Sequence, residues 1–432
     1  MVLKEMEGES ASLVTAVTVD PGAGCGPLIP LTNDPARPLR QQIFERVRAA
    51  GSLARIEISK ELGVSPGSVT AATAELIEAG LLSEIATPRP VGDTTRGRPP
   101  VALGVARGAG LVAGIKLSDR AHCAVILDHA GVVLGQANRS NVHRRKPVAD
   151  MIEDVAAVLD DALATVVGRG MPRPVPMAVG LGLPGIVDHE AGHVHWSPLL
   201  DATDVALQDR LTARLGLPVR LDNDANLVTL AELWFGVGRA LPDFAVVTVE
   251  HGLGMGLVLG HRLFRGARGL GMELGHTKVA LDGALCRCGQ RGCLEAYVAD
   301  YALMREAVTL FGWDAPDAAP EALLERLAAE AAAGNAEAVA ILRRAGRYLA
   351  LGIANIVNLL DPGLILLAGN RLRRDPLLAQ EVRHALSSFM LGRGRVPPRI
   401  EIQEEGDMRW AQGAAALALA LATDRMLGAE AA

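Results

Sequence analysis

The sequence predicts an α/β protein in which an N-terminal winged helix-turn-helix precedes a larger domain of two α/β lobes. Apolar residues between 37 and 80 follow the three-and-four spacing of short helices, and a glycine separates the second helix from the third. From about residue 106 onward, short apolar runs alternate with longer helical stretches, which is typical of strands joined by helices. At roughly 100–200 residues per domain, a chain of 432 residues is long enough for both parts.

Composition and charge exclude several classes of protein. With 50% hydrophobic and 21% charged residues, the chain is neither disordered nor fibrous. The formal charge of −6 excludes a general attraction to DNA or anionic lipid, so any nucleic-acid binding must be local. The first ten residues lack the pattern of a signal peptide, and the longest apolar run, Ala411–Ala422, is too short to cross a bilayer. We therefore expect a cytoplasmic protein without a membrane partner.

The start of the chain divides into a leader and a DNA-binding domain. Residues 1–36 combine several Gly and Pro residues with no amphipathic period, and they are expected to form a mobile leader. The expected DNA-binding domain follows over residues 37–105. Its first helix is marked by apolar residues at helical spacing: Ile43, Phe44, Val47 and Ala50. A second helix is expected over 55–62, with a turn at Gly63.

The third helix is expected to begin after Ser65, whose hydroxyl can cap it, and to end at Gly80. In a helix-turn-helix, the second helix of the pair enters the major groove. The outward residues of this helix are small, so we expect recognition to depend on DNA shape and on phosphates. The predicted DNA contacts at this helix are Ser65, Gly67, Ser68 and Thr70.

A wing is expected next, with a strand over 81–85 and then the RGRPP segment at 96–100. Arg96 and Arg98, held by Gly and Pro in an extended segment, suit a narrow A·T minor groove. Residues 37–107 contain ten basic and seven acidic residues, so this part is mildly positive. The three helices alone also fit a packing or protein-docking module, and RGRPP alone also fits a linker.

A cysteine-rich segment, CRCGQRGCLE at 286–295, indicates a metal site. Cys286, Cys288 and Cys293 lie on a glycine-bent loop that can direct three thiolates to the corners of a tetrahedron. His276, ten residues upstream, is the nearest imidazole for the fourth position. We expect a closed, structural zinc site that holds the loop and orients Glu295. The alternative is a set of reduced core cysteines.

These motifs resemble the signature of the ROK family, which includes bacterial sugar kinases and sugar-responsive transcriptional repressors. The matching segments are LGLPGIVD, LDNDANL, AELWFG, RGARGLGMELGH and CRCGQRGCLE, and the resemblance extends over nearly all of residues 37–422. It implies a two-lobed fold like that of sugar kinases, hsp70 and actin for residues 106–432. The helix-turn-helix followed by RGRPP resembles the repressor branch of the family, because the kinases lack this extension.

The resemblance also implies an effector site for a sugar or sugar derivative. Carboxylates and a carboxamide accept and donate hydrogen bonds to vicinal hydroxyl groups. The implied residues are Asn223, Asp224, Glu273, His276 and Glu295. Taken alone, the Asp-Asn-Asp run at 222–224 also fits a loop cap or turn.

The chain departs from the family's kinases where a nucleotide would bind. Residues 116–120 read KLSDR where the kinases carry an Asp-x-Gly-Gly-Thr phosphate loop, and Glu250-His251 stands where they have a small Gly-Thr pair. Only Ala368-Gly369-Asn370 remains of the adenosine-side glycines. We therefore expect no kinase activity and no catalytic residues, with Asp224 kept as a sugar acceptor.

Two further positions bear on this interpretation. Lys116 is expected either to pair with a carboxylate such as Asp224 or to point into solvent. Leu199 stands where family members often have an Asn that can touch the sugar, so the pocket is either tuned to an unusual sugar or no longer responsive.

The function predicted from the sequence is a transcriptional regulator, most simply a repressor. Its expected partners are a double-stranded DNA operator, a sugar effector and further copies of itself in a homodimer or homotetramer. In a symmetric dimer, sugar binding would change the spacing of the two DNA-binding units. The alternatives are a sugar kinase with an added DNA-binding module, and a regulator that no longer senses sugar and is controlled by a protein partner.

Overall fold

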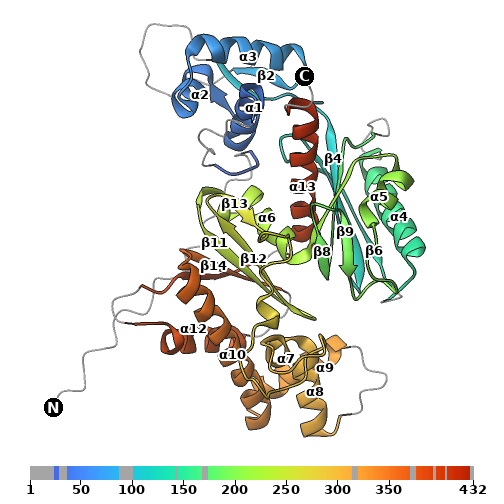
Figure 1. Ribbon diagram of the computed structural model, residues 1–432, viewed down its shortest axis with the longest axis vertical. Helices are drawn as coiled ribbons and strands as arrows, with labels where there is room; N and C mark the ends of the chain where they lie inside the picture. Colours follow the sequence, from blue (N-terminus) through green and yellow to red (C-terminus); the bar gives the residue numbers. More distant parts are fainter. Residues whose placement is uncertain are drawn as a thin grey trace, which may run out of the picture.

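The structure is a computed structural model, and it places the DNA-binding unit at one end of two α/β lobes (Figure 1). It describes residues 24–28, 37–86, 101–141, 145–167, 174–313, 320–369, 376–392, 396–403 and 406–428. Within these ranges, no helix is both long and apolar enough to span a membrane.

The N-terminal unit is a winged helix-turn-helix, as expected. Its helices are α1 (Leu39–Ala50), α2 (Arg55–Leu62) and α3 (Pro66–Glu78). Among the described residues, β1 (Leu53–Ala54), β3 (Val101–Val105) and β2 (Leu82–Ala86) form an antiparallel sheet in that order. Gly63 ends α2 with a φ of 64°, a left-handed conformation that favours glycine. The apolar faces of helices and sheet enclose one core, which includes Phe44, Val69, Leu76 and Leu103.

The first lobe is built on a mixed sheet of order β10-β7-β4-β5-β6. The strands are β4 (Leu111–Lys116), β5 (Ala121–Asp128), β6 (Val133–Ser140), β7 (Val179–Leu183) and β10 (Val219–Asn223). Helix α4 (Val148–Val167) packs on β5 and β6, and α5 (Leu207–Leu215) contacts α4 and β10. Strands β8 (Ile186–Asp188) and β9 (His193–Trp196) form a separate hairpin.

The last helix, α13 (Met408–Leu427), lies against β4 and β7 of the same sheet. Glycines allow this close approach, because a Cβ at Gly114 would lie 2.1 Å from the Ala411 carbonyl oxygen. A Cβ at Gly180 would lie 1.8 Å from the Ala414 carbonyl oxygen. The run 411–422 is therefore part of a core helix rather than a surface or membrane segment.

The second lobe has a sheet of order β13-β12-β11-β14-β15. The strands are β11 (Phe244–Val249), β12 (Leu253–Leu259), β13 (Arg262–Phe264), β14 (Leu364–Ala368) and β15 (Arg399–Ile402). The helices that build the rest of this lobe are α7 (Glu295–Val298), α8 (Asp300–Phe311), α9 (Pro320–Ala332), α10 (Ala336–Leu360) and α12 (Pro376–Phe389). Helix α6 (Asp224–Phe235) packs on α13 and on β12, and a short turn, η1 (Val237–Ala240), follows it.

Part of the expected mobile leader is packed in this structure. The described residues 24–28 lie against the DNA-binding unit and the second lobe, and Cys25 is only 1% exposed. The Cys25 amide donates to the Arg48 carbonyl (3.0 Å), and the Gly26 amide donates to that of Trp234 (2.8 Å). Composition could not predict this, because the partners lie far along the chain. The domain limits at 36/37 and 105/106 remain predictions.

Candidate effector site and metal-binding loop

Asn223 and Asp224 stand at the junction of β10 and α6. The Asn223 side chain caps the helix, since its Oδ1 accepts from the Ala225 amide (2.8 Å) while its Nδ2 donates to the Gly185 carbonyl (2.7 Å). The cap considered for this run is therefore present. Asp224 follows in the first turn of α6. Burial raises the pKa of Asp224 to about 6, with Lys116 opposing and Glu250 adding to the rise.

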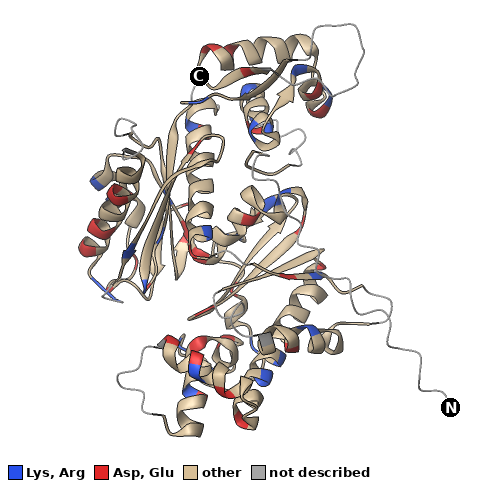
Figure 2. Ribbon diagram, turned by 180° about the vertical axis from the view of Figure 1, so that it is seen from behind, with Lys and Arg blue, Asp and Glu red and all other residues tan. Residues whose placement is uncertain are grey.

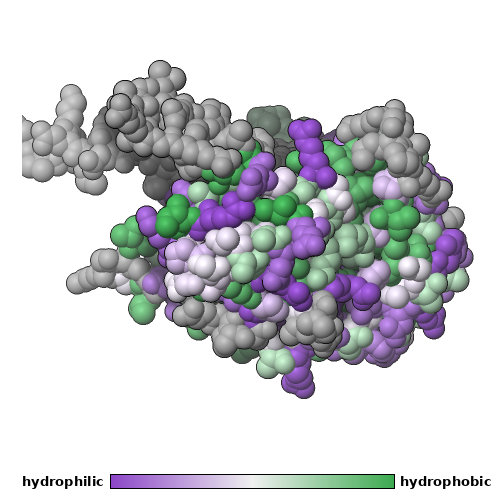
Figure 3. All heavy atoms as spheres, turned by 90° about the horizontal axis from the view of Figure 1, so that it is seen from above, coloured by the Kyte–Doolittle hydropathy of each residue, from purple (hydrophilic) through white to green (hydrophobic). Residues whose placement is uncertain are grey.

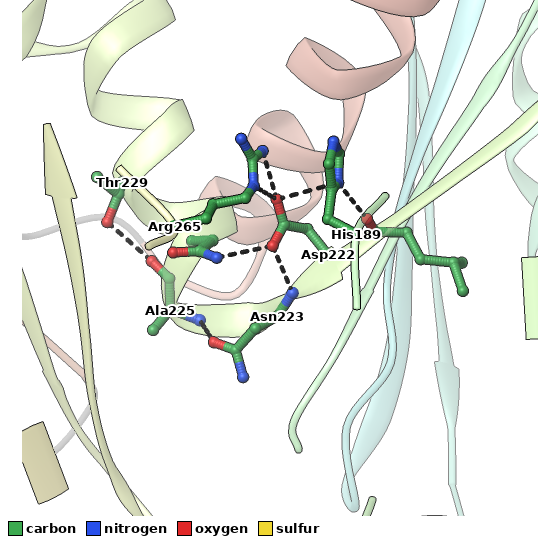
Figure 4. A network of polar contacts seen from close by, with 8 residues as sticks. His189, Asp222, Asn223, Ala225, Thr229 and Arg265 are labelled. Atoms are coloured by element: carbon green, nitrogen blue, oxygen red, sulfur yellow. Dashed lines mark hydrogen bonds and ion pairs between the residues drawn. The ribbon is translucent and has the colours of Figure 1, made fainter. Parts of the chain in front are cut away.

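Asp222 organises this junction, although no motif in the sequence singled it out. Its carboxylate is buried and accepts hydrogen bonds from the Asn223 amide (2.8 Å) and from Asn226 Nδ2 (2.7 Å). It also accepts two from the Arg265 guanidinium, from Nε (2.9 Å) and from a terminal nitrogen (2.6 Å). His189 Nδ1 lies 3.5 Å from the same carboxylate. Figure 4 shows Arg265 and His189 converging on Asp222, with Asn223 beside it. Arg265 thus ties the segment after β13 to the end of β10.

The remaining predicted effector residues come from the second lobe. Glu273 precedes the short turn η2 (Leu274–His276), and Glu295 begins α7. Glu295 is 8% exposed, and its Oε2 accepts from the Leu253 amide (3.2 Å) while Tyr301 Oη lies 3.4 Å from Oε1.

Electrostatics indicate that these groups lie close together. The pKa of Glu273 is raised, first by burial of its carboxyl group and then by the negative charges of Asp224 and Glu295, with His276 opposing. The Glu273 side chain as a whole is still reached by solvent. The charges of Asp224 and Glu295 therefore act on the Glu273 carboxyl group.

His276, Cys286, Cys288 and Cys293 converge as expected. Their ligand atoms all lie within 4.8 Å of one another. Cys286 Sγ lies 3.7 Å from His276 Nδ1, and Cys288 Sγ lies 3.7 Å from Cys293 Sγ. In a tetrahedron with Zn–S bonds of about 2.3 Å, the sulfur atoms stand about 3.8 Å apart. The cluster can therefore hold a metal ion.

Ion pairs occupy the region where the sequence departs from the kinases. Lys116 is buried, and its Nζ lies 3.0 Å from Asp407 Oδ1 and 4.3 Å from the centre of the Trp410 ring. The expectation of a carboxylate partner is confirmed, but that partner is Asp407 and not Asp224. The alternative that Lys116 points into solvent is wrong. Asp224 interacts with it at longer range.

Two further pairs from the β4–β5 turn reach across to the second lobe. Asp119 Oδ2 lies 3.1 Å from His251 Nε2, and Arg120 Nε lies 2.7 Å from Glu321 Oε1. Polar side chains thus contact one another in the region where the sequence departs from the kinases.

Leu199 is buried in the core of the first lobe. Its side chain packs beside β-strand residues and is only 1% exposed, so Leu199 offers the effector no polar contact.

The predicted DNA contacts on α3 are solvent-exposed. Ser65 Oγ caps the helix by accepting from the Ser68 amide (3.1 Å), and Thr70 Oγ1 donates to the Pro66 carbonyl (2.9 Å). Gly67 and Ser68 lie between them and are also exposed. Seen from the end of the molecule that carries α2 and α3, the surface mixes hydrophilic and hydrophobic residues (Figure 3).

Positive charge is sparse on this helix. Helix α3 carries no Lys or Arg, and its only acidic residues, Glu75 and Glu78, lie towards its C-terminal end. Figure 2 shows the basic residues of the unit on the neighbouring elements, where Lys60 of α2 is exposed. Arg96 and Arg98 lie outside the described residues. Lys and Arg contacts to phosphates are therefore expected from elements around α3, whereas α3 itself offers hydroxyl and backbone N–H groups.

The fold and the site together define a winged helix-turn-helix joined to a two-lobed, sugar-kinase-like domain with a Cys₃His loop. The ROK family pattern matches residues 127–421, and the chain belongs to the ROK family.

Named relatives lie in both branches of this family. The chain is 28% identical over 346 residues to the xylose repressor of Caldicellulosiruptor bescii, covering 78% of this chain and 84% of that protein. It is 29% identical over 276 residues to the glucokinase of Streptomyces coelicolor, covering 61% and 84%. The crystal structure of a ROK family transcriptional regulator, a homologue of the E. coli MLC protein, superimposes with a TM-score of 0.73 at 26% identity, covering 89% and 96%.

Proposed function

We propose that this protein is a DNA-binding transcriptional repressor that responds to a sugar or sugar derivative. The observation that carries the proposal is the combination of a winged helix-turn-helix with the carboxylates Asp224, Glu273 and Glu295, whose charges act on one another. The xylose repressor named above combines a sugar and repression in its name, and the ROK structure named above is that of a transcriptional regulator. We propose that it acts in the cytoplasm, as a homodimer or homotetramer on a double-stranded operator.

We further propose that the sugar-kinase-like domain does not phosphorylate its ligand. Lys116 and Arg120 form ion pairs, and Asp119 lies beside His251, in the region where a nucleotide's phosphates would lie. The carboxylate of Asp119 would repel these phosphates. Asp224 then serves as a hydrogen-bond acceptor for a sugar hydroxyl group.

Zinc is the metal that this donor set favours. Three sulfur atoms and one imidazole nitrogen match a closed structural zinc site, which has no open position for a catalytic water. Bound zinc would supply structural cross-linking alone. The residues around it would then fix the His276 ring and the loop that leads to Glu295.

A thermal-shift screen of the zinc-loaded protein tests the proposal. We expect one of xylose, glucose or N-acetylglucosamine to raise the melting temperature, because a ligand that binds only the folded state stabilises it. ATP with magnesium should cause no shift. Shifts with both sugar and ATP would support a kinase instead, and silence across the sugars would favour a regulator controlled by a protein partner.

Glu295→Ala is the matched variant for the sugar response. The substitution removes one of the proposed effector carboxylates, whose Oε2 accepts a hydrogen bond from the Leu253 amide. The sugar-induced rise in melting temperature should therefore disappear. Glu153→Ala serves as the control, since Glu153 pairs with Arg214 on the exposed surface of the first lobe. A Glu295→Ala protein that kept the full sugar shift would contradict the assignment of the site.

A further inference from the structure

Helix α6 connects the proposed effector site to the DNA-binding unit. It begins at Asp224, next to its cap Asn223, and ends at Phe235. At about 1.5 Å per residue, its twelve residues extend about 18 Å. Figure 1 shows α6 between the lobes and the DNA-binding unit.

The far end of α6 binds the DNA-binding unit and the leader together. Arg239, in the turn after α6, is 2% exposed, and its Nε donates to the Gly26 carbonyl (3.0 Å). A terminal nitrogen of the same guanidinium donates to the carbonyl of Ala49, in the last turn of α1. The Arg239 carbonyl in turn accepts from the Leu28 amide (2.8 Å). One buried side chain therefore joins three segments.

Trp234, in the last turn of α6, makes a second set of contacts. The guanidinium of Arg48, in α1, lies 4.7 Å from the centre of the Trp234 ring. The backbone carbonyl of Trp234 accepts a hydrogen bond from the Gly26 amide. Arg48 also donates to Thr423 Oγ1 of α13 (2.9 Å). The end of α1 is thus held by α6 and by α13 at once.

Helices α6 and α13 are joined by a buried ion pair and by close backbone packing. A buried ion pair joins Arg409 of α13 to Glu232 of α6 (3.0 Å). A Cβ at Gly413 would lie 1.8 Å from the Leu227 carbonyl, so the two backbones are nearly in contact. A displacement of the effector end of α6 cannot be absorbed between the helices, since packed interiors are nearly incompressible.

We infer that α6 transmits effector binding to the DNA-binding unit, and that Arg239 is the positioning residue that holds α1 to it. This inference rests on the proposed function, because it requires an effector at Asn223 and Asp224. It adds the route by which that effector reorients the helix-turn-helix. Leader residues 25–28 add backbone hydrogen bonds to this contact.

Amide hydrogen exchange of the full-length, zinc-loaded chain tests the inference without a known operator. The probe is whichever of xylose, glucose or N-acetylglucosamine gives the thermal shift. Saturation should change exchange at α1 residues 39–50 by about fivefold or more, within the usual range of coupling between sites. In Arg239→Met, the same sugar should bind with a Kd within about threefold of wild type, since the residue is far from the sugar, but the change at α1 should be lost.

Arg46→Met is the matched control. Arg46 also lies on α1 and donates to the leader, at the Leu28 carbonyl (2.6 Å), but its other partner is Glu61 of α2 and not α6. In Arg46→Met, the sugar-induced change in amide exchange at α1 should be retained. Trp234→Leu provides a second, independent variant should Arg239→Met fail to fold, and it too should lose the response.

The outcomes separate the two claims. Sugar binding without any change at α1 in the wild type would overturn the inference and leave the proposed function standing. An undiminished α1 response in Arg239→Met, or in Trp234→Leu where only that variant folds, would also overturn it. A wild type that binds none of the sugars contradicts the proposed function, and the inference with it.

Discussion

At the scale of single residues, Asp224 is the group whose ionisation most directly controls the effector site. Burial raises its pKa to about 6 from 3.8. A raised carboxyl pKa means that the folded state is favoured when the group is protonated. The contribution of Asp224 to the free energy of unfolding is complete below pH 3.8 and is lost as the pH rises through about 6. A shift of this size corresponds to about 3 kcal/mol as an upper value.

We predict that sugar affinity falls as the pH drops below about 6, because a protonated Asp224 is a weaker acceptor. Isothermal titration between pH 5 and 8 measures this. In Asp224→Asn the affinity should be lower and independent of pH over the same range, while the melting temperature at pH 7.5 should rise. A wild-type affinity that stays constant through pH 6 would contradict the assignment.

Lys116 gives a linked prediction. Its ammonium group lowers the pKa of Asp224, so Lys116→Met should move the midpoint of the pH-dependent sugar affinity to higher pH. The variant should also be less stable by about 1–3 kcal/mol, because Asp407 loses its partner. Denaturant unfolding and the same titrations check both effects. Arg139→Met, which removes an exposed pair with Asp161, should change neither.

Sequence reasoning succeeded for residues that stand in local motifs and failed for long-range partners. The ELGH and CRCGQRGC patterns located His276 and its three cysteines, because ligand spacing is a local property. The partner of Lys116 is 291 positions away, and Arg265 is 43 positions from Asp222. No spacing rule reports such pairs, since the fold alone brings them together.

At the scale of elements, we expect the loop from His276 to Glu295 to depend on a bound metal ion. Cys286 and Cys293 are buried, whereas Cys288 is exposed, so Cys288→Ser removes one ligand with little loss of packing. We predict that this variant loses its bound zinc and unfolds at a lower temperature, since metal binding contributes folding free energy. Metal analysis and thermal unfolding, with and without a chelator, measure both quantities.

Cys123→Ser is the control for the metal. This buried cysteine lies in β5, outside the cluster, and its replacement should lower stability without changing the zinc content. If Cys288→Ser retained one zinc per chain, the four-ligand site would be wrong.

The elements themselves were largely predictable where they satisfy their own local rules. Helix α2 occupies the expected residues 55–62, and α3 begins at Pro66 behind its Ser65 cap. The packed leader and the two-residue strand β1 were not predictable. Both depend on backbone hydrogen bonds to distant segments, which apolar spacing does not encode.

At the scale of the whole molecule, the DNA-binding unit and the first lobe meet at a buried histidine. The ring of His129, just after β5, lies 6.2 Å from that of Phe44 in α1, at an angle of 62°. Burial lowers the pKa of His129 to about 4. A hydrogen bond with the Gly110 backbone opposes this change, and the positive charge of Arg48 adds to it. A lowered pKa contributes stability above pH 6.5, which is lost as the pH falls through about 4.

We predict that acid destabilises this interface, and that His129→Leu moves the acid unfolding midpoint to lower pH. The depressed pKa corresponds to about 3 kcal/mol. A pH series of melting temperatures measures the effect, with the exposed His384→Leu as control. Identical acid midpoints for His129→Leu and wild type would show that His129 titrates freely. His122, buried in β5 with a pKa also lowered to about 4, should add to the acid sensitivity that His129→Leu leaves.

Because α13 contacts both the first lobe and the DNA-binding unit, the order of synthesis matters for this protein. A ribosome completes residues 37–105 early, but Met408–Leu427 only after the segments that this helix covers. Until then, the sheet face at Gly114 and Gly180 has no cover, and Gln41 and Arg48 lack their partners Asp424 and Thr423. A nascent chain that has not reached α13 therefore lacks Leu427, which completes the core of the DNA-binding unit. We expect this unit to be fixed on the lobes only after Met408–Leu427 has been translated.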